Sequence, residues 1–348
     1  MATIWDVAKE AGVSPSTVSN VLHKRSVVKV ETQERVLSAI DKLNFHPSRA
    51  AQGLRQQAAR AIGFLVFDPN PRWPTDPLHA EVIAGMAQAA SAHDYSLMLD
   101  QPNRVDGHVT AREFLKPFRA SKIDAAVVAL SGVAGSYQYV LDELNAANVL
   151  FAVLEQDIEV EVGGDCAYAV MSANEDGAYA ATKKLIADKH CCVAFLDSAQ
   201  MWPAIELRLR GYRAAMREAG LEDQIITSAS PDWTSAGGAL AMRALLDRCD
   251  AEGKPHPSAV LAGNDVLAVG AMHALRERGL RVPHDVAVIG FDDFEFARYV
   301  DPPLTTVRLP AFEMGYRAAE LLIQHVEGQP DTQRKFVLPT ELIVRESG

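Results

Sequence analysis

Apolar residues follow two different patterns on either side of residue 60. In the first part they recur three and four positions apart, which is the spacing of an amphipathic helix. In the second part, short continuous apolar runs alternate with segments of helical periodicity. Continuous apolar strands are typical of parallel sheets that helices cover on both faces. The pattern therefore predicts a small helical unit followed by a larger α/β region.

The helical unit opens with two short helices joined by a tight turn. Thr3 and Asp6 have the spacing of a capping box, and Gly12 is predicted to end the first helix at positive φ. Ser14 then caps a second helix that starts at Pro15. The positions expected to be buried are Ile4, Val7, Ala8, Ala11, Val18, Val21 and Leu22. This is the pattern of a helix-turn-helix, which places one helix in the DNA major groove.

The outward positions of the second helix are short and polar. They are Ser16, Thr17, Ser19, Asn20 and His23. Side chains of this kind suit contacts with base edges or phosphates. The alternative reading of these two helices is an ordinary helical hairpin within a larger core.

A third helix is predicted over about residues 31–43, with Val36, Leu37, Ile40 and Leu43 facing inward. The segment Phe45-His46-Pro47 ends this helix, because the residue before a proline avoids the helical conformation. We therefore expect a headpiece over residues 1–47. Residues 48–60 read as a short, weakly helical segment and a linker.

The α/β region contains more strand–helix units than one sheet would hold. The predicted strands cover residues 61–67, 95–99, 125–130, 149–154, 192–196, 224–227, 259–262 and 286–290. The predicted helices cover residues 79–92, 137–147, 175–187, 207–219, 236–248 and 265–278. We therefore expect two α/β lobes, with a ligand cleft between them at the carboxyl ends of the strands.

Charge is distributed unevenly along the chain. The net charge is −11, but residues 1–60 hold nine Lys and Arg against five Asp and Glu, so they carry +4 and the remainder carries −15. A basic head on an acidic body fits phosphate contact through one end. The four cysteines show no spacing of metal ligands, and no apolar run is long enough to cross a bilayer. We expect a cytoplasmic protein without a cofactor or metal ion.

Four stretches have the composition and order of one known family. They are Asp6-Val7-Ala8 through Ser19, Leu43-Asn44-Phe45-His46-Pro47 through Leu54, Gly263-Asn264-Asp265 through Gly290-Phe291-Asp292-Asp293, and Leu338-Pro339-Thr340-Glu341 through Ser347. Through them the whole chain resembles the lactose-repressor family of bacterial transcription regulators. The resemblance implies a headpiece, a hinge helix and a dimerising two-lobed core that is periplasmic-binding-protein-like. It implies a first lobe over residues 61–158 and 309–328, and a second over 159–308 and 329–348.

The resemblance also implies which residues contact DNA. Residues that match Pro15, Ser16 and Asn20 read bases in relatives, and Leu54 matches a hinge leucine that wedges into the minor groove. Asn20 stands where arginine is usual, so we expect adenine rather than guanine at that base pair, unless Asn20 contacts only phosphate. Leu54 could instead only anchor the linker. The remaining candidates are Thr3, Ser14, Thr17, Ser19, His23, Thr32, Ser48 and Ala51.

Two departures from the family pattern concern the headpiece. Lys29-Val30 replaces a usual Ser-Pro at the start of the third helix, so that helix lacks its side-chain cap. His23 stands where asparagine is usual, which leaves its contact undefined.

For the effector pocket, the resemblance implies Arg208, Trp233, Asn264 and Asp292 from the second lobe. From the first lobe it adds Leu78 and His79. Asp68 is a further candidate because it lies on the same loop, and Glu155 is another because it ends the strand at 149–154. Carboxylates, a guanidinium, an amide and an aromatic face suit vicinal hydroxyls or a heterocycle. We expect a sugar or sugar derivative as effector, with a purine-like metabolite as the alternative. Arg208 and Asp292 could instead form an interlobe ion pair with no ligand.

Two other classes of protein fit the sequence less well. An enzyme is disfavoured, because the Ser, His and Asp residues form no triad motif and no phosphate-binding glycine pattern is present. A solute-binding protein without a DNA role would not need the basic headpiece. We expect a ligand-responsive regulator, most simply a repressor, that binds a pseudo-palindromic operator as a homodimer.

Overall fold

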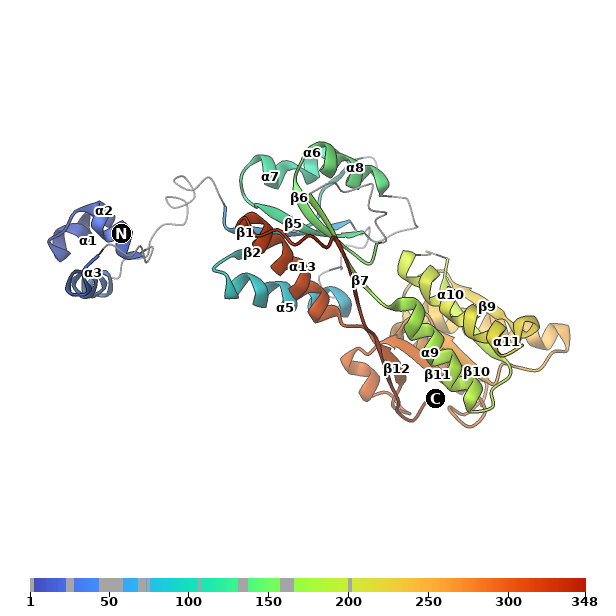
Figure 1. Cartoon of the computed structure of the whole chain (residues 1–348). Helices are drawn as coiled ribbons and strands as arrows, with labels where there is room; N and C mark the ends of the chain where they lie inside the picture. Colours follow the sequence, from blue (N-terminus) through green and yellow to red (C-terminus); the bar gives the residue numbers. More distant parts are fainter. Residues whose placement is uncertain are drawn as a thin grey trace. The chain divides into compact units, whose positions relative to one another are not determined.

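The computed structural model describes residues 3–22, 28–43, 59–67, 73, 76–105, 108–130, 137–156, 166–199 and 202–348 (Figure 1). Its contacts divide the chain into two units, Met1–Ala59 and Arg60–Gly348. Within the described residues, every helix is too short or too polar to span a lipid bilayer.

The first unit is a headpiece of three helices, α1 (Ile4–Ala11), α2 (Pro15–Leu22) and α3 (Val30–Lys42). The predicted capping box of Thr3 and Asp6 is confirmed, and Gly12 ends α1 with φ 65°. No side chain caps α3, as the sequence predicted. The core of the headpiece consists of Val7, Ala8, Ala11, Val18, Val21, Val36 and Ala39.

One inward position predicted in α3 is wrong. The Leu37 side chain is 52% exposed, whereas Val36 and Ala39 are buried and Ile40 and Leu43 pack partly against them. On a helix, positions 36, 39, 40 and 43 share one face, and position 37 is turned about 100° away from position 36. Leu37 therefore belongs to the outer surface of α3.

The second unit contains two six-stranded sheets. The first has the order β13-β7-β6-β5-β1-β2, and all its pairs are parallel. Its strands are β1 (Ala61–Phe67), β2 (Ser96–Asp100), β5 (Ala125–Leu130), β6 (Leu150–Leu154), β7 (Ala167–Ser172) and β13 (Lys335–Leu338). A separate two-stranded hairpin joins β3 (Arg104–Val105) to β4 (His108–Val109). Every residue of β1 is buried, as its continuous apolar sequence predicts.

The second sheet has the order β14-β12-β11-β10-β8-β9, and only its edge strand β14 is antiparallel. Its strands are β8 (Val193–Ser198), β9 (Ile226–Ser230), β10 (Ala259–Ala262), β11 (Ala287–Asp292), β12 (Thr305–Arg308) and β14 (Glu341–Ile343). Phe195 and Leu196 are successive residues of β8, so they point to opposite faces of the sheet, and each is buried in a different hydrophobic cluster. Both faces of this sheet are therefore packed.

Helices cover both sheets. In the first lobe, α5 (Pro77–Ala92) and α13 (Ala311–Val326) lie on one face, and α6 (Ala111–Phe114), α7 (Lys116–Arg119) and α8 (Gln138–Ala146) lie on the other (Figure 1). In the second lobe, α9 (Asn174–Ala187) packs with α10 (Pro203–Glu218), and α11 (Ser235–Glu252) packs with α12 (Asp265–Glu277). Two short 3-10 helices, η4 (Glu222–Gln224) and η5 (Glu295–Arg298), complete the second lobe.

The lobe boundaries predicted near residues 158 and 329 differ from the structure. Strands β7 and β13 pair with each other in the first sheet, although the sequence placed both in the second lobe. The chain therefore crosses to the second sheet after Ser172 and again after Leu338. The physical reason is that the edge strand β13 pairs with β7, which is far away in sequence, and local periodicity does not report such pairing.

Helices α5 and α13 touch backbone to backbone. A Cβ on Gly85 would lie 2.0 Å from the carbonyl oxygen of Phe312, and one on Gly315 would lie 2.1 Å from that of Val82. Arg60, at the start of this unit, sits beside the carboxyl ends of both helices. Its guanidinium donates to the His93 carbonyl at 2.6 Å and lies 3.8 Å from Glu327.

Candidate functional site

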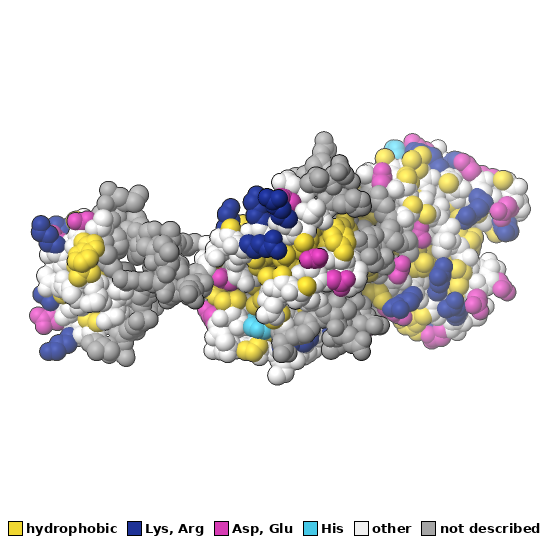
Figure 2. All heavy atoms as spheres, turned by 90° about the horizontal axis from the view of Figure 1, so that it is seen from above, with side chains coloured by type: hydrophobic (Ala, Val, Ile, Leu, Met, Phe, Trp, Pro, Cys, Tyr) yellow, Lys and Arg dark blue, Asp and Glu magenta, His cyan; other side chains and the backbone are white. Residues whose placement is uncertain are grey.

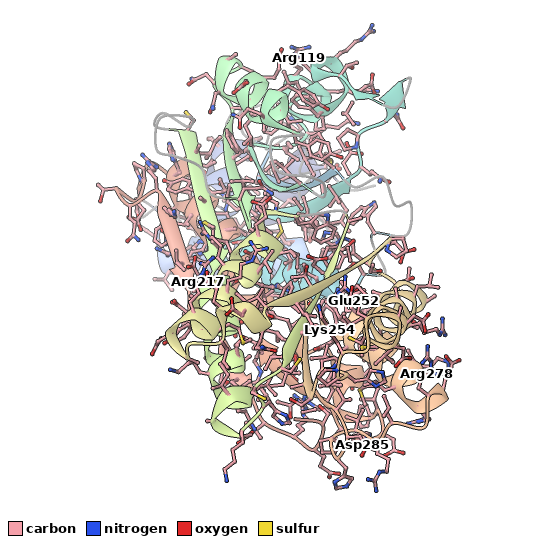
Figure 3. All side chains as sticks on the ribbon, turned by 90° about the vertical axis from the view of Figure 1, so that its right-hand side faces the viewer. Arg119, Arg217, Glu252, Lys254, Arg278 and Asp285 are labelled. Atoms are coloured by element: carbon pink, nitrogen blue, oxygen red, sulfur yellow. The ribbon has the colours of Figure 1, made fainter. Side chains whose placement is uncertain are left out.

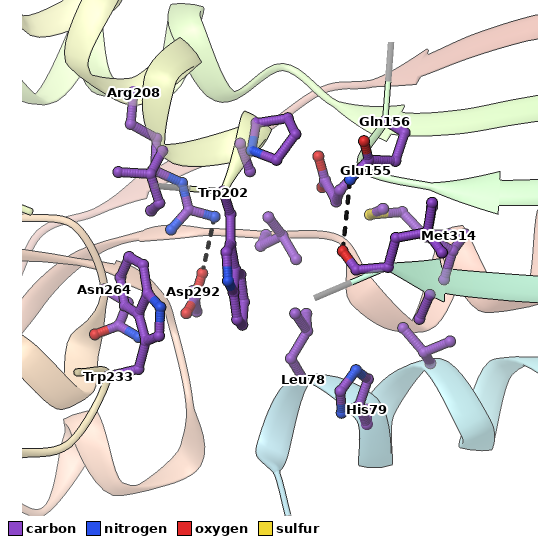
Figure 4. A pocket seen from close by; sticks show the side chains of 18 residues that line it. Leu78, His79, Glu155, Gln156, Trp202, Arg208, Trp233, Asn264, Asp292 and Met314 are labelled. Atoms are coloured by element: carbon purple, nitrogen blue, oxygen red, sulfur yellow. Dashed lines mark hydrogen bonds and ion pairs between the residues drawn. The ribbon is translucent and has the colours of Figure 1, made fainter. Parts of the chain in front are cut away.

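A cavity of about 80 Å³ lies between the two lobes of the second unit (Figure 4). Its walls are formed by the ends of β5, β6 and β11 and by the first turns of α5, α10 and α13. It is lined by Leu78, His79, Val82, Ala129, Leu130, Leu154, Glu155, Gln156, Trp202, Pro203, Ala204, Ile205, Arg208, Trp233, Asn264, Asp292, Leu309 and Met314. The carboxyl ends of parallel strands meet here, where open α/β sheets bind ligands.

Arg208, on the second turn of α10, is the most constrained polar side chain of the cavity. Its Nε donates to Asn174 Oδ1 at 2.7 Å and its Nη1 donates to the Gly263 carbonyl at 2.6 Å. Its Nη2 lies 3.2 Å from Asp292 Oδ1, and the guanidinium stacks on the Phe291 ring at 3.7 Å. The whole side chain is buried, so its position is fixed before any ligand enters.

Asp292 ends β11 in an unusual backbone conformation, with φ 111°. Burial raises the pKa of its carboxyl to about 7, although the guanidinium of Arg208 opposes this rise; Asp76 and Glu155 add smaller contributions in the direction of burial. The next residue, Asp293, also has positive φ and forms ion pairs with Arg308 and Arg345. Strain of this kind, held by surrounding contacts, is typical of ligand sites.

Glu155 follows β6, where its φ is 54°. Ser172 Oγ donates to one carboxylate oxygen at 2.6 Å, and Asn174 Nδ2 donates to the other at 2.7 Å. Burial raises the pKa of this carboxyl, although these hydrogen bonds and Arg208 act in the opposite direction. Asn174 therefore bonds to Glu155 of the first lobe and to Arg208 of the second.

Two indole rings form the aromatic part of the cavity wall. The centroids of Trp202 and Trp233 are 5.1 Å apart and their planes are inclined by 38°. The Nε1 atom of Trp233 is buried and makes no hydrogen bond within the described residues. In Figure 4, Trp202 stands beside Asp292, with Leu78 across the cavity from it. The arrangement offers an apolar ring face next to a charged pair.

The first lobe supplies Leu78 and His79 from the start of α5. Asp76 caps this helix by accepting a hydrogen bond from the Leu78 amide at 2.9 Å, and Pro77 occupies its first turn. His79 is buried, and its Nδ1 lies 3.2 Å from the Trp73 carbonyl. These contacts fix the direction in which Leu78 faces the cavity.

The structure brings together seven residues that the sequence singled out for an effector: Leu78, His79, Glu155, Arg208, Trp233, Asn264 and Asp292. Asn264 also caps α12, because its Oδ1 accepts from the Leu267 amide at 2.8 Å. The eighth, Asp68, lies outside the described residues. Sequence analysis missed Trp202 and Gln156, which line the cavity, and Ser172 and Asn174, which lie behind Glu155. Pro203, directly after Trp202, marks the start of a helix but gives no sign of the cavity.

The candidate DNA contacts of the headpiece cluster at the start of α2. Ser14 Oγ accepts from the Thr17 amide at 3.2 Å and lies 2.7 Å from Ser16 Oγ. Ser16 is exposed, and Pro15, Thr17, Ser19, Asn20 and Thr32 are half-buried. Thr3 is exposed but engaged in the α1 cap. His23, Ser48, Ala51 and Leu54 lie outside the described residues. Trp5, which the sequence analysis did not single out, is 71% exposed on α1.

Within the described residues, no group of three or more His, Cys, Asp or Glu side chains is arranged to hold a metal ion. The four cysteines all carry free thiols. The polar groups that line the cavity are one guanidinium, two carboxyls, two side-chain amides, two indole N–H groups and one imidazole.

Comparison with known proteins agrees with this architecture. Residues 3–48 match the family described as "Bacterial regulatory proteins, lacI family", and residues 182–348 match the periplasmic binding protein-like domain. The chain is 33% identical over its whole length to the HTH-type transcriptional repressor PurR of Vibrio campbellii, of which it covers 98%.

Solved structures show the same similarity. The lac repressor dimer bound to operator and the anti-inducer ONPF aligns with a TM-score of 0.82 at 26% identity, over 99% of this chain and 98% of that one. The complex of the transcriptional regulator CelR with cellobiose aligns with a TM-score of 0.71 at 29% identity, over 100% of both chains. The chain belongs to the lacI family of bacterial regulatory proteins; it is a DNA-binding transcriptional repressor and not an enzyme.

Proposed function

We propose that this repressor binds a small polyhydroxylated effector, a sugar or sugar derivative, in the interlobe cavity. The protein binds a pseudo-palindromic operator as a dimer, and effector binding changes its affinity for that operator. The observation that carries this proposal is the buried Arg208–Asp292 pair, at 3.2 Å, beside the two indoles of Trp202 and Trp233, which pack against each other at an inclination of 38°. The apolar face of a sugar ring packs on an indole, while its hydroxyl groups pair with carboxylates and guanidinium.

The roles of the cavity residues follow from their contacts. Arg208 and Asp292 hydrogen-bond adjacent ligand hydroxyls, and the buried Trp233 Nε1 donates to a ligand oxygen. Glu155, Asn264, Leu78 and His79 complete the enclosure from both lobes. A ligand that contacts both lobes stabilises one lobe arrangement over another, which is the requirement for a linked change in DNA affinity.

A purine-like effector is the second candidate. It is favoured by the 33% identity to a repressor named PurR and by the flat aromatic wall, because a heterocycle stacks on an indole as well as a sugar does. The CelR complex, which contains cellobiose, supports the first candidate. The two classes differ in that a sugar presents many hydroxyl donors and a purine presents few.

For the DNA-binding headpiece, we propose that Pro15, Ser16 and Asn20 contact base edges. Ser14 and Thr17 stabilise the start of α2 through the hydrogen bond between them, and we assign Thr3, Ser19 and Thr32 to phosphate contacts. Asn20 suits an adenine through its N6 and N7 atoms. His23 and the hinge residues Ser48, Ala51 and Leu54 remain predictions from the sequence.

The test is a thermal-shift screen of the full chain with cellobiose, D-ribose, D-glucose, adenine and guanine. A ligand at about 100 times its Kd adds about 2.7 kcal/mol to the free energy of unfolding. Any compound that stabilises the protein is then added to a selection of operator sequences from random duplexes. We expect it to change the affinity for the selected duplex by tenfold or more.

Two results would contradict the proposal. Stabilisation that persists undiminished in an Arg208→Lys variant would place the ligand elsewhere, because lysine cannot reproduce the guanidinium contacts. A ligand that stabilises the core without altering affinity for the selected duplex would separate binding from regulation. Stabilisation by adenine or guanine alone would select the second candidate over the first.

A further inference from the structure

Four basic side chains lie together on the outer surface of the first lobe. Arg112 on α6, Lys116 and Arg119 on α7, and Lys122 after it are all exposed, and we call them the basic stripe. Lys116 and Arg119 are three positions apart on α7, and Arg112 lies four positions before Lys116 on the preceding helix α6. Figure 2, seen from the side of α6 and α7, shows Lys and Arg side chains gathered on this area.

The opposite face of the same segment is anchored in the core. Phe114, Leu115 and Pro117 are buried, which fixes the direction in which the basic stripe points. Cations elsewhere in the core are commonly paired with a carboxylate, as Arg210 is with Glu175 and Arg243 with Glu277. In the described part of the chain, the four side chains of the basic stripe have no such partner.

The position of the basic stripe follows from strand pairing. Lys122 precedes Asp124, whose amide donates to the Ala61 carbonyl at 2.8 Å and whose carboxylate accepts from the Ala61 amide at 3.1 Å. Ala61 is the first residue of β1, directly after the linker. The basic stripe is therefore next to the place where the chain enters the core, and Figure 3 shows Arg119 at the outer edge of the first lobe.

We propose that the basic stripe contacts the phosphate backbone of DNA beyond the base pairs that the headpiece reads. The chain after residue 60 carries a net charge of −15, so most of its surface is repelled by DNA. Residues 112–122 carry four cations against Glu113, and this local net charge of +3 beside the linker offsets that repulsion where tethering brings the core close to the duplex. Arg and Lys side chains without protein partners are free to replace phosphate counterions. This surface adds to the DNA contacts of the headpiece and does not depend on an effector.

The experiment measures binding of the full chain to random-sequence duplex pools of 18 and 40 base pairs between 50 and 200 mM KCl. The variant is Lys116→Gln with Arg119→Gln. The matched control is Lys189→Gln with Arg298→Gln, which removes two exposed second-lobe cations that also lack a described partner. Each lost phosphate contact lowers the slope of log affinity against log salt by about 0.9.

We expect the stripe variant to bind the 40-base-pair pool about 3–10-fold more weakly at 50 mM KCl, with a slope shallower by about 1–2. Its binding to the 18-base-pair pool should change by less than about twofold, and its thermal midpoint should stay that of the unmodified chain. The proposal is overturned if the control variant loses as much affinity, since that would show an effect of net charge alone. It is also overturned if the slope on the long duplex is unchanged.

Discussion

The cavity wall that the second lobe supplies differs in chemistry from the wall that the first lobe supplies. Trp202, Arg208, Trp233 and Asp292 come from the second lobe, whereas the first contributes mainly aliphatic side chains such as Met314. The charged group of the first lobe, Glu155, is already bonded to Ser172 and Asn174. Under the proposed function, the second lobe would therefore orient a ligand, while the first would chiefly shape and enclose the space.

Arg208→Ala should have the largest effect of any single change at the cavity. It leaves buried Asp292 without its cation and removes bonds to Asn174 and Gly263, so we expect a loss of about 3–5 kcal/mol in the free energy of unfolding. Urea denaturation of the full chain measures it. Arg210→Ala, two residues along α10 at an exposed ion pair, should lose less than about 1 kcal/mol. Equal losses would mean that the second-lobe wall has no special role.

Asn174→Asp tests the hydrogen bonds that connect Glu155 in the first-lobe wall to Arg208 in the second-lobe wall. It places a second carboxyl 2.7 Å from Glu155, with Arg208 and Asp292 as the other charged groups nearby. One carboxyl of such a pair takes a raised pKa when folded, so its stability contribution is present at low pH and lost as pH rises. We expect a loss of about 2 kcal/mol at pH 8 and less at pH 5.5.

The matching control exchanges the carboxyl and the amide between positions 155 and 174. In the double variant Glu155→Gln with Asn174→Asp, the new amide can donate to the new carboxylate while accepting from Ser172, so most of the loss at pH 8 should be recovered. Asn148→Asp adds the same charge at an exposed position of the first lobe and should change stability little. A double variant no better than Asn174→Asp alone would argue against a direct link between the lobes.

Asp292→Asn should reduce the pH dependence of stability. Burial raises the folded pKa of this carboxyl to about 7, above its unfolded value near 3.9. A raised pKa gives stability that is present below the unfolded pKa and lost as pH rises through about 7. The variant should therefore show a shallower decline in the free energy of unfolding between pH 5 and 8. An unchanged decline would assign it to other buried acids such as Asp265 or Asp197.

Met314→Leu should have the smallest effect. The side chain contributes apolar surface to the first-lobe wall, and leucine nearly conserves its volume. We expect a change below about 1.5 kcal/mol in stability and only a few-fold change in the affinity for any compound that the thermal-shift screen identifies. A loss comparable to that of Arg208→Ala would abolish the distinction between the walls.

Much of the fold follows from the sequence because its signals are local. The capping box at Thr3, the left-handed Gly12 and the apolar run of β1 each depend on a few neighbouring residues. Residues 167–172 and 335–338, which form β7 and β13, were assigned to the wrong lobe, because the two strands pair with each other across more than 160 residues. The prediction that Leu37 faces inward was also wrong, because this apolar residue lies off the buried face of α3.

The candidate site was predictable where the family resemblance supplied a matching position. Arg208, Asp292 and Trp233 all line the cavity, as the resemblance implied. Asn174 could not be found in this way, because its importance comes from two hydrogen bonds to residues 19 and 34 positions away. Trp202 becomes meaningful only when folding brings it to Trp233.

The glycine contact between α5 and α13 has a consequence for how a signal leaves the cavity. The first turn of α5 carries Leu78, α13 carries Met314, and both helices end beside the anchored side chain of Arg60. With backbones touching at Gly85 and Gly315, neither helix has room to slip past the other. A shift of either helix would therefore require the other to move with it, and both end at Arg60, where the chain enters the first lobe.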